Sequence, residues 1–199
     1  MGAVREVPQL SFSEDDYQAA AARLGVPVAA IKAVAEVEAG GATHWTIAGA
    51  LRPPVRLEAH WFGKLTGYQF NASHPEISCT RWTPGLAART WAGAWAQVEA
   101  ACALDEDAAR QATSWGAFQI MGFHWKALGY ASVQEMVAAM DTAGGQLDAF
   151  VRFVEADPVL LDALRRHDWH AFAGRYNGPG QVDHYAGRIA QACARHGGE

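Results

Sequence analysis

The sequence has few cysteines, and their arrangement excludes two kinds of small stabilised domain. Its three cysteines, Cys79, Cys102 and Cys193, are odd in number and widely spaced. This pattern suits neither a disulfide framework nor a zinc knuckle. We therefore expect reduced thiols, two of them in helix cores, with a nucleophilic cysteine beside a histidine as the alternative.

The chain also lacks long apolar runs and an excess of positive charge. No apolar run approaches the roughly 20 residues that cross a bilayer, so we expect no membrane insertion. The first ten residues, MGAVREVPQL, lack the basic start and apolar segment of a signal peptide, which predicts synthesis in the cytoplasm. The net charge of −5 offers no concentrated basic face, so we expect no nucleic-acid partner.

What is present is the composition of a compact domain. The chain has 199 residues, of which 50% are hydrophobic and 19% are charged. It shows no fixed-period repeat, low-complexity tract or linker. This predicts a single domain over residues 1–199 with a substantial core and no separate binding module.

Helix start and stop signals recur along the chain. Ser13 and Asp16 form a capping-box pattern, Gly25 closes that helix, and a second helix is predicted over 27–39 with Gly40 as its stop. Apolar spacing predicts a helix over 86–102 and a last one after the NGPG break at 177–180. Further starts are expected at Asp105, at Ser132 with Glu135, and at Asp157 followed by Pro158.

Strand signals are confined to a short part of the sequence. Pro53 and Pro54 forbid a helix, and Val55 and Leu57 alternate with charged residues. Residues 66–85 are rich in turn formers and are predicted to be a loop. The expected fold is mostly α, with one small β element near residues 45–58.

Two glutamates in the stretch EVEAG, residues 36–40, have different expected environments. Glu38 shares a helix face with Ile31, Val34 and Ala35, whereas Glu36 follows Lys32 by four residues and predicts a surface ion pair. Burial and the negative end of the helix dipole would both raise the pKa of Glu38. Such an acid can protonate the leaving oxygen in glycosidic cleavage. The alternative is a structural carboxylate paired with an arginine such as Arg175.

Two further motifs contain candidate binding residues. In SWGAFQIM, residues 114–121, Trp115 and Phe118 could stack on sugar rings, and Gln119 could bind a hydroxyl or N-acetyl group. The alternative is that these side chains are core and that Gln119 satisfies a backbone group. In RYNGPG, residues 175–180, a helix end and a Gly-Pro turn would hold Tyr176 and Asn177 rigidly.

Taken together and in this order, the three stretches resemble the lysozyme-like superfamily of goose-type lysozymes and soluble lytic transglycosylases. From YQAAAARLGV through RLEAHWFGKLTG to DWHAFAGRYNGPG, the chain is most similar to the N-acetylmuramidase domain of phage endolysins. The resemblance implies a lysozyme-like α+β fold with a helical bundle. It also implies cleavage of the β-1,4 bond between N-acetylmuramic acid and N-acetylglucosamine in peptidoglycan, leading to cell lysis, with Glu38 as the catalytic acid.

A second acid and two tryptophans complete the expected site. Glu58 leaves the predicted strand and could face Glu38 across a cleft, either as a base or as a nucleophile; its alternative is an exposed acid at a helix start. Without a second carboxylate nearby, the substrate's own 6-hydroxyl would give the anhydro product of a lytic transglycosylase. Trp61 and Trp45 lie next to the motifs and are expected to contact sugar.

Other functions stay open at this stage. A zinc-dependent amidase or peptidase could use His167, His170 and His184, and a non-catalytic wall-binding module could use the same groove. We favour a metal-independent enzyme without a cofactor, a monomer that acts on periplasmic glycan strands after release or delivery. The resemblance favours a phage enzyme over a secreted bacterial effector. The net negative charge provides no general attraction to anionic peptidoglycan.

Overall fold

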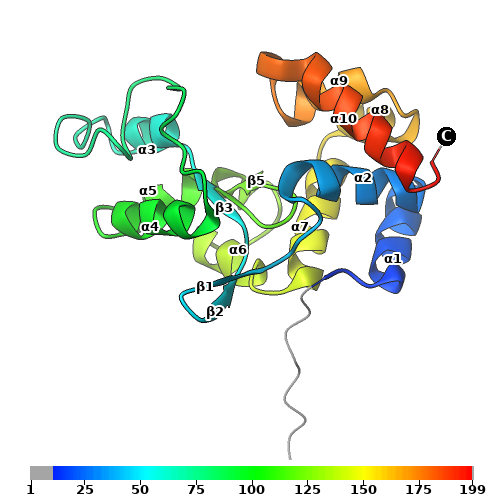
Figure 1. Cartoon of the computed structure of the whole chain (residues 1–199), viewed down its shortest axis with the longest axis horizontal. Helices are drawn as coiled ribbons and strands as arrows, with labels where there is room; N and C mark the ends of the chain where they lie inside the picture. The colour runs from blue at the N-terminus through cyan, green and yellow to red at the C-terminus, as the bar shows by residue number, and fades with distance from the viewer. Residues whose placement is uncertain (1–10, 199) are drawn as a thin grey trace, which may run out of the picture.

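The computed structural model describes residues 11–198 as a mostly helical protein with two small sheets (Figure 1). Residues 1–10, on which the prediction about a signal peptide rests, lie outside this range. The helices are α1 (Glu14–Leu24), α2 (Val28–Ala39), α3 (Ala59–Leu65), α4 (Trp91–Cys102), α5 (Glu106–Gln111), α6 (Val133–Ala139), α7 (Ala143–Glu155), α8 (Pro158–Arg165), α9 (Trp169–Tyr176) and α10 (Val182–Arg195), with short 3-10 turns at Gly122–His124 and Pro179–Gln181.

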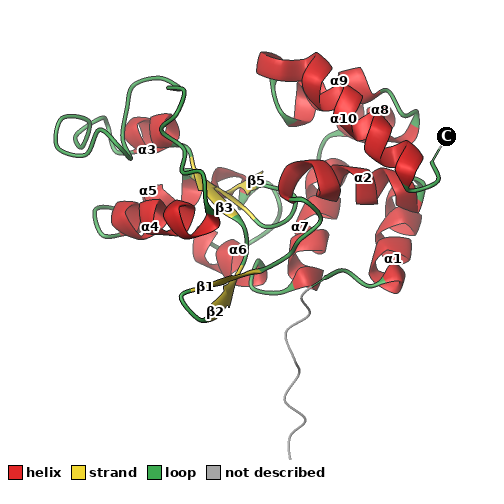
Figure 2. Cartoon of the chain, viewed as in Figure 1, coloured by secondary structure: helices red, strands yellow, loops and turns green. Residues whose placement is uncertain are grey.

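Five short strands form two separate sheets (Figure 2). β1 (Trp45–Ile47) and β2 (Ala50–Arg52) make an antiparallel hairpin. β3 (Val55–Leu57), β4 (Thr113–Trp115) and β5 (Ile120–Met121) make an antiparallel sheet. The prediction of one β element near 45–58 is therefore incomplete, because the SWGAFQIM motif supplies two more strands.

The predicted helix caps are largely confirmed. Ser13 and Asp16 form a complete capping box, and Gly25 and Gly40 end α1 and α2 in the left-handed conformation. Asp105, Ser132 and Asp157 each accept a hydrogen bond from the first turn of their helix. Pro27 precedes α2 as its N-cap residue. The box at Ser132 is only half formed, since Glu135 accepts from the backbone of Ala131 instead.

The helix predicted over 86–102 begins later, at Trp91. Thr90 caps it by accepting a hydrogen bond from the Gly93 backbone N–H. The amide of Gln97 binds the preceding segment in a non-helical path, donating to the Leu86 carbonyl and accepting from the Ala88 N–H. Tertiary hydrogen bonds thus outweigh the apolar periodicity of residues 86–90.

The predicted ion pair between Glu36 and Lys32 is wrong. Lys32 instead pairs with Glu14 of α1 at 2.6 Å. Glu36 pairs with Arg195 and with His196 at the end of α10. Both side chains bridge neighbouring helices because α1 and α10 pack on the two sides of α2.

Apolar packing around α2 and α7 makes up most of the core. α2 is buried on most of its surface, which fits a helix that is hydrophobic nearly all round. The apolar face of α7, which includes Phe150 and Val154, is buried, and Phe150 stacks on Phe118 with ring centroids 4.2 Å apart. The three cysteines are free thiols, with Cys193 buried in α10.

Within residues 11–198, no helix is both long enough and apolar enough to span a bilayer.

One buried amide connects three loops that meet behind the second sheet. Gln146 is 1% exposed; it donates to the carbonyl oxygens of Thr43 and Met140 at 2.9 and 2.8 Å and accepts from the Ala117 N–H at 2.8 Å. All of these groups would lie buried without a partner if the amide were removed.

We expect Gln146→Leu to lower the free energy of unfolding by about 3 kcal/mol, because it leaves several buried backbone groups unsatisfied. Chemical denaturation followed by circular dichroism measures this difference. The matched control is Gln18→Leu, at an exposed position of α1, which should change stability little. Equal stability of the two variants would contradict the assigned role of Gln146.

Candidate active site

A cleft of ≈ 320 Å³ lies between the two groups of helices seen in Figure 1, with α2, α9 and α10 on one side and β3 on the other. Its lining residues come from six elements and the turns beside them: Val37, Glu38, Arg56, Glu58, Ser114, Gln119, Met121, Tyr176, Asn177, Tyr185 and Arg188. The fold therefore brings both predicted acids and the predicted Tyr-Asn pair into a single cavity.

Glu38 occupies the last turn of α2, where the left-handed Gly40 ends the helix. Its Oε1 accepts a hydrogen bond from Nδ2 of Asn177 at 2.8 Å. Burial raises the pKa of the Glu38 carboxyl, and the Asn177 bond and the charges of Arg188 and Arg56 offset only part of that effect. The alternative pairing with Arg175 is wrong, because Arg175 pairs with Asp157.

Glu58 follows β3 directly and stands at the start of α3. Its backbone N–H donates to the Ala112 carbonyl at 2.9 Å, which continues the β3–β4 ladder, and its side chain makes no capping bond. The side chain is only 24% exposed, so the alternative of an exposed helix-start acid is wrong. Burial raises the pKa of Glu58, and the nearby Arg56 charge opposes this.

Tyr176 and Asn177 end α9 just before Gly178, whose positive φ of 82° turns the chain away. The Tyr176 hydroxyl donates to the Phe118 carbonyl at 2.6 Å, and burial raises the pKa of the phenol well above its usual value. Oδ1 of Asn177 is buried and has no hydrogen-bond partner among the described residues. The turn thus orients the Asn177 amide so that its N–H group points at Glu38.

Gln119 lines the cleft, but its amide is engaged with the protein. Nε2 donates to the Gly116 carbonyl at 2.9 Å and to the Pro54 carbonyl at 3.4 Å, while Oε1 accepts from the Ser114 hydroxyl at 3.0 Å. These bonds hold the β4–β5 turn, in which Gln119 has a positive φ of 49°. This arrangement matches the alternative to sugar binding, in which the Gln119 amide satisfies backbone groups.

Trp115 and Phe118 belong to the core and have no ring face open to a sugar. They are 2% and 1% exposed, and the Trp115 indole donates to the Arg110 carbonyl. The expectation that they stack on sugar rings is therefore wrong. All three side chains of β4 are buried, and the Trp115 ring fills the core against Trp95 of α4.

The fold does not bring Trp45 and Trp61 into the cleft lining. Trp45 packs against Trp91 with ring centroids 5.8 Å apart, and Trp61 packs against Phe123 at 4.8 Å. Closeness to a motif in sequence did not place either ring beside the acids.

Comparison with known proteins identifies the family of this chain. A family model described as N-acetylmuramidase matches residues 27–197. The chain belongs to the N-acetylmuramidase family. A solved structure, the crystal structure of Burkholderia AP3 phage endolysin, matches with a TM-score of 0.80 and 38% sequence identity, over 98% of this chain and 75% of that one. A search of curated proteins finds no match.

These findings confirm the resemblance that the motifs indicated. The muramidase has the lysozyme-like, mostly helical fold of an endolysin, and it is a peptidoglycan-cleaving glycoside hydrolase of the lysozyme type. The zinc-binding set is not assembled: among residues 11–198 no group of three His, Cys, Asp or Glu side chains could hold a metal ion. His170 pairs with Asp183 and His167 stacks on Trp169.

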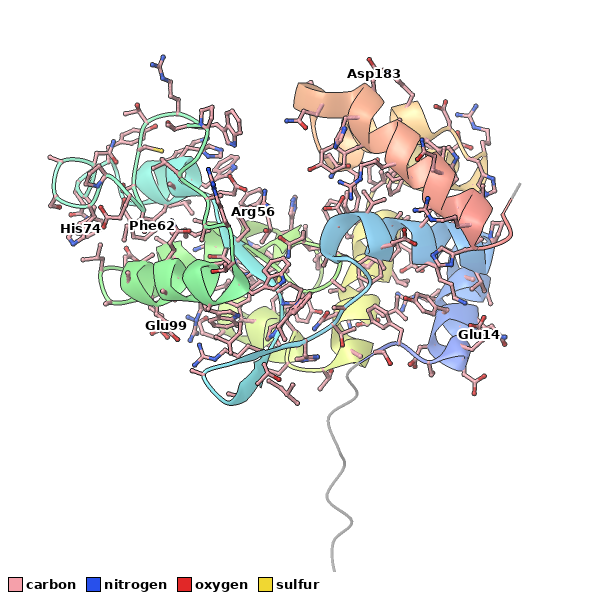
Figure 3. All side chains as sticks on the ribbon, in the orientation of Figure 1. Glu14, Arg56, Phe62, His74, Glu99 and Asp183 are labelled. Carbon is pink, nitrogen blue, oxygen red and sulfur yellow. The ribbon has the colours of Figure 1, made fainter. Side chains whose placement is uncertain are left out.

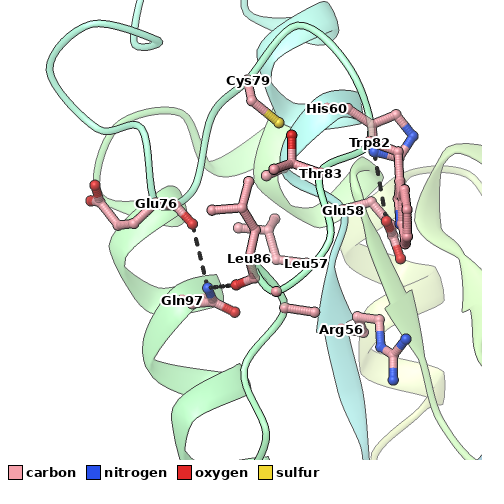
Figure 4. Close-up of a pocket in the computed structure, with 13 residues that line it drawn as sticks. Arg56, Leu57, Glu58, His60, Glu76, Cys79, Trp82, Thr83, Leu86 and Gln97 are labelled. Atoms are coloured by element: carbon pink, nitrogen blue, oxygen red, sulfur yellow. Dashed lines mark hydrogen bonds and ion pairs between the residues drawn. The ribbon is translucent and has the colours of Figure 1, made fainter.

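A second pocket adjoins the muramidase cleft and shares Arg56 and Glu58 with it (Figure 4). Trp82 and Glu58 both line this second pocket (Figure 4), and Trp82 is 61% exposed. The sequence motifs did not indicate Trp82 as a candidate sugar contact, because residues 66–85 have no periodicity. The available signal was a tryptophan among polar turn residues, in TRWTPG, where no core explains it.

We expect Trp82→Ala to reduce kcat/KM on peptidoglycan by roughly tenfold, because the exposed Trp82 ring lies in a pocket shared with the candidate acid Glu58 and can stack on a sugar. Release of reducing ends measures this effect. Trp45→Ala is the matched control, since Trp45 is 40% exposed but lies outside both pockets. Equal effects of the two substitutions would argue against a sugar platform at Trp82.

The raised pKa of Glu38 also predicts a pH dependence of stability. An acid whose pKa is higher in the folded state binds protons more readily there, so its ionisation destabilises the fold as pH rises above about 4.5, its ordinary pKa. The free energy of unfolding of Glu38→Gln, minus that of the wild type, should therefore increase between about pH 4 and about pH 8. Denaturant titrations of both proteins at both pH values measure this difference. Glu58 is present in both proteins, so its contribution to the difference cancels. A difference independent of pH would contradict a raised pKa at Glu38.

Proposed function

We propose that this muramidase cleaves the β-1,4 bond between N-acetylmuramic acid and N-acetylglucosamine, with Glu38 as general acid and Glu58 as general base. The observation that carries the proposal is the presence of both carboxyl groups in one cleft, on different elements. Glycoside hydrolysis needs such a pair, since one group protonates the leaving oxygen and the other assists attack at the sugar carbon.

The hydrogen bond from Asn177 assigns different tasks to the two oxygens of Glu38. Oε1 accepts the Asn177 N–H, so the proton to be transferred belongs on Oε2. Burial and the carboxyl end of α2 both favour the protonated form before the substrate binds. Transfer of this proton to the bridging oxygen breaks the glycosidic bond as the leaving alkoxide forms.

Glu58 comes from the other wall of the cleft, where it can take a proton from a water molecule that attacks the sugar from the face opposite the acid. A base that activates water for direct displacement gives inversion at the anomeric carbon, whereas direct attack by the Glu58 carboxylate would give retention. Burial raises the pKa of Glu58, and the charge of Arg56 opposes this shift toward the ionised form that a base requires. Tyr176 keeps its proton and supports the site through the Phe118 carbonyl rather than by proton transfer.

Similarity to a phage endolysin supports a role in lysis. In this role the protein acts as a monomer on periplasmic peptidoglycan after release from the cytoplasm. The net charge of −5 makes nucleic acid an unsuitable partner.

Glu38→Gln should lower the release of reducing ends from purified peptidoglycan by about 10²–10⁴-fold, the usual contribution of a general acid. The matched control is Glu36→Gln, in the same helix but paired with Arg195 away from the cleft, which should keep its activity. Equal activity of the wild type and Glu38→Gln would overturn the assignment of the acid.

The products of the same digestion test the rest of the mechanism. Mass spectrometry should find hydrated muramic ends, since anhydro ends would mean a lytic transglycosylase. Early NMR spectra should show the α-anomer, because inversion of a β-linkage is expected, whereas a β-anomer would make Glu58 a nucleophile. Glu58→Gln should also lose activity, by about 10²-fold or more.

A further inference from the structure

Two arginines line the cleft from opposite walls. Arg56 lies on β3 and Arg188 on α10, and both side chains are exposed. Figure 3 shows Arg56 between the two groups of helices, at the level of the cleft. Two guanidinium groups therefore flank the two candidate catalytic acids.

Neither guanidinium forms an ion pair with a carboxylate in the part of the chain that the structure describes. Arg188 makes one long hydrogen bond, from Nη2 to the Val37 carbonyl at 3.4 Å, and the Arg56 side chain donates none. Seven other arginines pair with acids, whereas Arg81, Arg89 and Arg165 form no such pair within residues 11–198; the paired ones are Arg23, Arg52, Arg110, Arg152, Arg166, Arg175 and Arg195.

The proposed chemistry does not explain why both cations are present. A general acid must keep its proton, and positive charge from Arg188 and Arg56 lowers the pKa of Glu38. The charge of Arg56 also opposes the raised pKa of Glu58, whereas the charge of Arg188 lowers the pKa of Glu38. Its position beside the acid works against proton retention, so it points to a ligand with negative charge.

The cleft also differs in charge from the whole protein. The chain carries a net charge of −5, yet the two guanidinium groups outnumber the one carboxylate that is ionised when Glu38 holds its proton. The net negative charge of the protein gives no general attraction to an anionic wall. The two guanidinium groups provide such attraction inside the cleft, where the substrate lies. Guanidinium is suited to this task because its planar fork matches a carboxylate in two parallel hydrogen bonds.

We propose that Arg56 and Arg188 bind carboxylates of the peptides attached to the muramic acid units, so that the preferred substrate is glycan whose peptides carry free carboxylates. The inference rests on the proposed function, because it names the substrate class of the same cleft. The peptides carry free carboxylates close to the glycan strand, and they are the anionic groups that remain beside an uncharged sugar backbone.

The test compares soluble glycan strands that carry their peptides with the same strands after carbodiimide coupling to ammonia has converted the peptide carboxylates to neutral amides. The readout is the ratio of kcat/KM on strands with free peptide carboxylates to kcat/KM on amidated strands, measured by reducing-end release. We expect the double variant Arg56→Gln, Arg188→Gln to lower this ratio about tenfold, with each single variant giving a smaller decrease. The ratio for the wild type should also fall as salt rises, because salt screens exposed charges.

Two further variants sharpen the comparison. Arg188→Lys keeps the charge without the fork and should lower the ratio less than Arg188→Gln does. Arg166→Gln is the matched control, since Arg166 is exposed on α8 and pairs only with Asp162, and its ratio should equal that of the wild type.

Equal losses on both substrates would overturn the inference, because the arginines would then act on the sugars or on the acids. An unchanged ratio in the double variant would overturn it as well. Failure of the proposed function has a different signature: Glu38→Gln would then cleave both kinds of strand as fast as the wild type.

Discussion

The hydrogen bond between Asn177 and Glu38 is the contact on which the organisation of the site depends. It joins the end of α2 to the end of α9 across 139 positions of sequence. The carboxyl is buried, and a buried acid without a partner would be costly. Because the bond engages one oxygen only, it holds the group in place and leaves the other oxygen to carry a proton.

The rest of the fold supplies the second wall against which this acid works. Pairing of β3 with β4 fixes the position of Glu58 through the Ala112 carbonyl, and the Gln119 amide closes the turn that follows β4. Gln146 then binds that turn to the loops after α2 and α6. The distance between the two walls is thus set by buried hydrogen bonds rather than by exposed loops, as a preorganised site requires.

The charge of the cleft differs in sign from the net charge of the protein. Most arginines neutralise acids on the surface, where such pairs contribute little to stability. Arg56 and Arg188 are different because they face the cleft and have no carboxylate partner within residues 11–198. A net negative protein can in this way present positive charge to its substrate.

The sequence by itself determined the helices with strong caps and the inward position of Glu38, because both depend on spacings within one turn of helix. It also determined the family, since three motifs in a fixed order are specific. Only the tertiary structure decided which aromatic rings are open: Trp115 is buried against Trp95 of α4, whereas Trp82, in a loop without periodicity, is exposed in the pocket that Glu58 also lines. It likewise decided the partners of Glu36, which lie 159 and 160 positions away, and the start of α4, which depends on bonds that Gln97 makes across 9 and 11 positions. Burial and charge pairing are properties of neighbours in space, and a local pattern does not contain them.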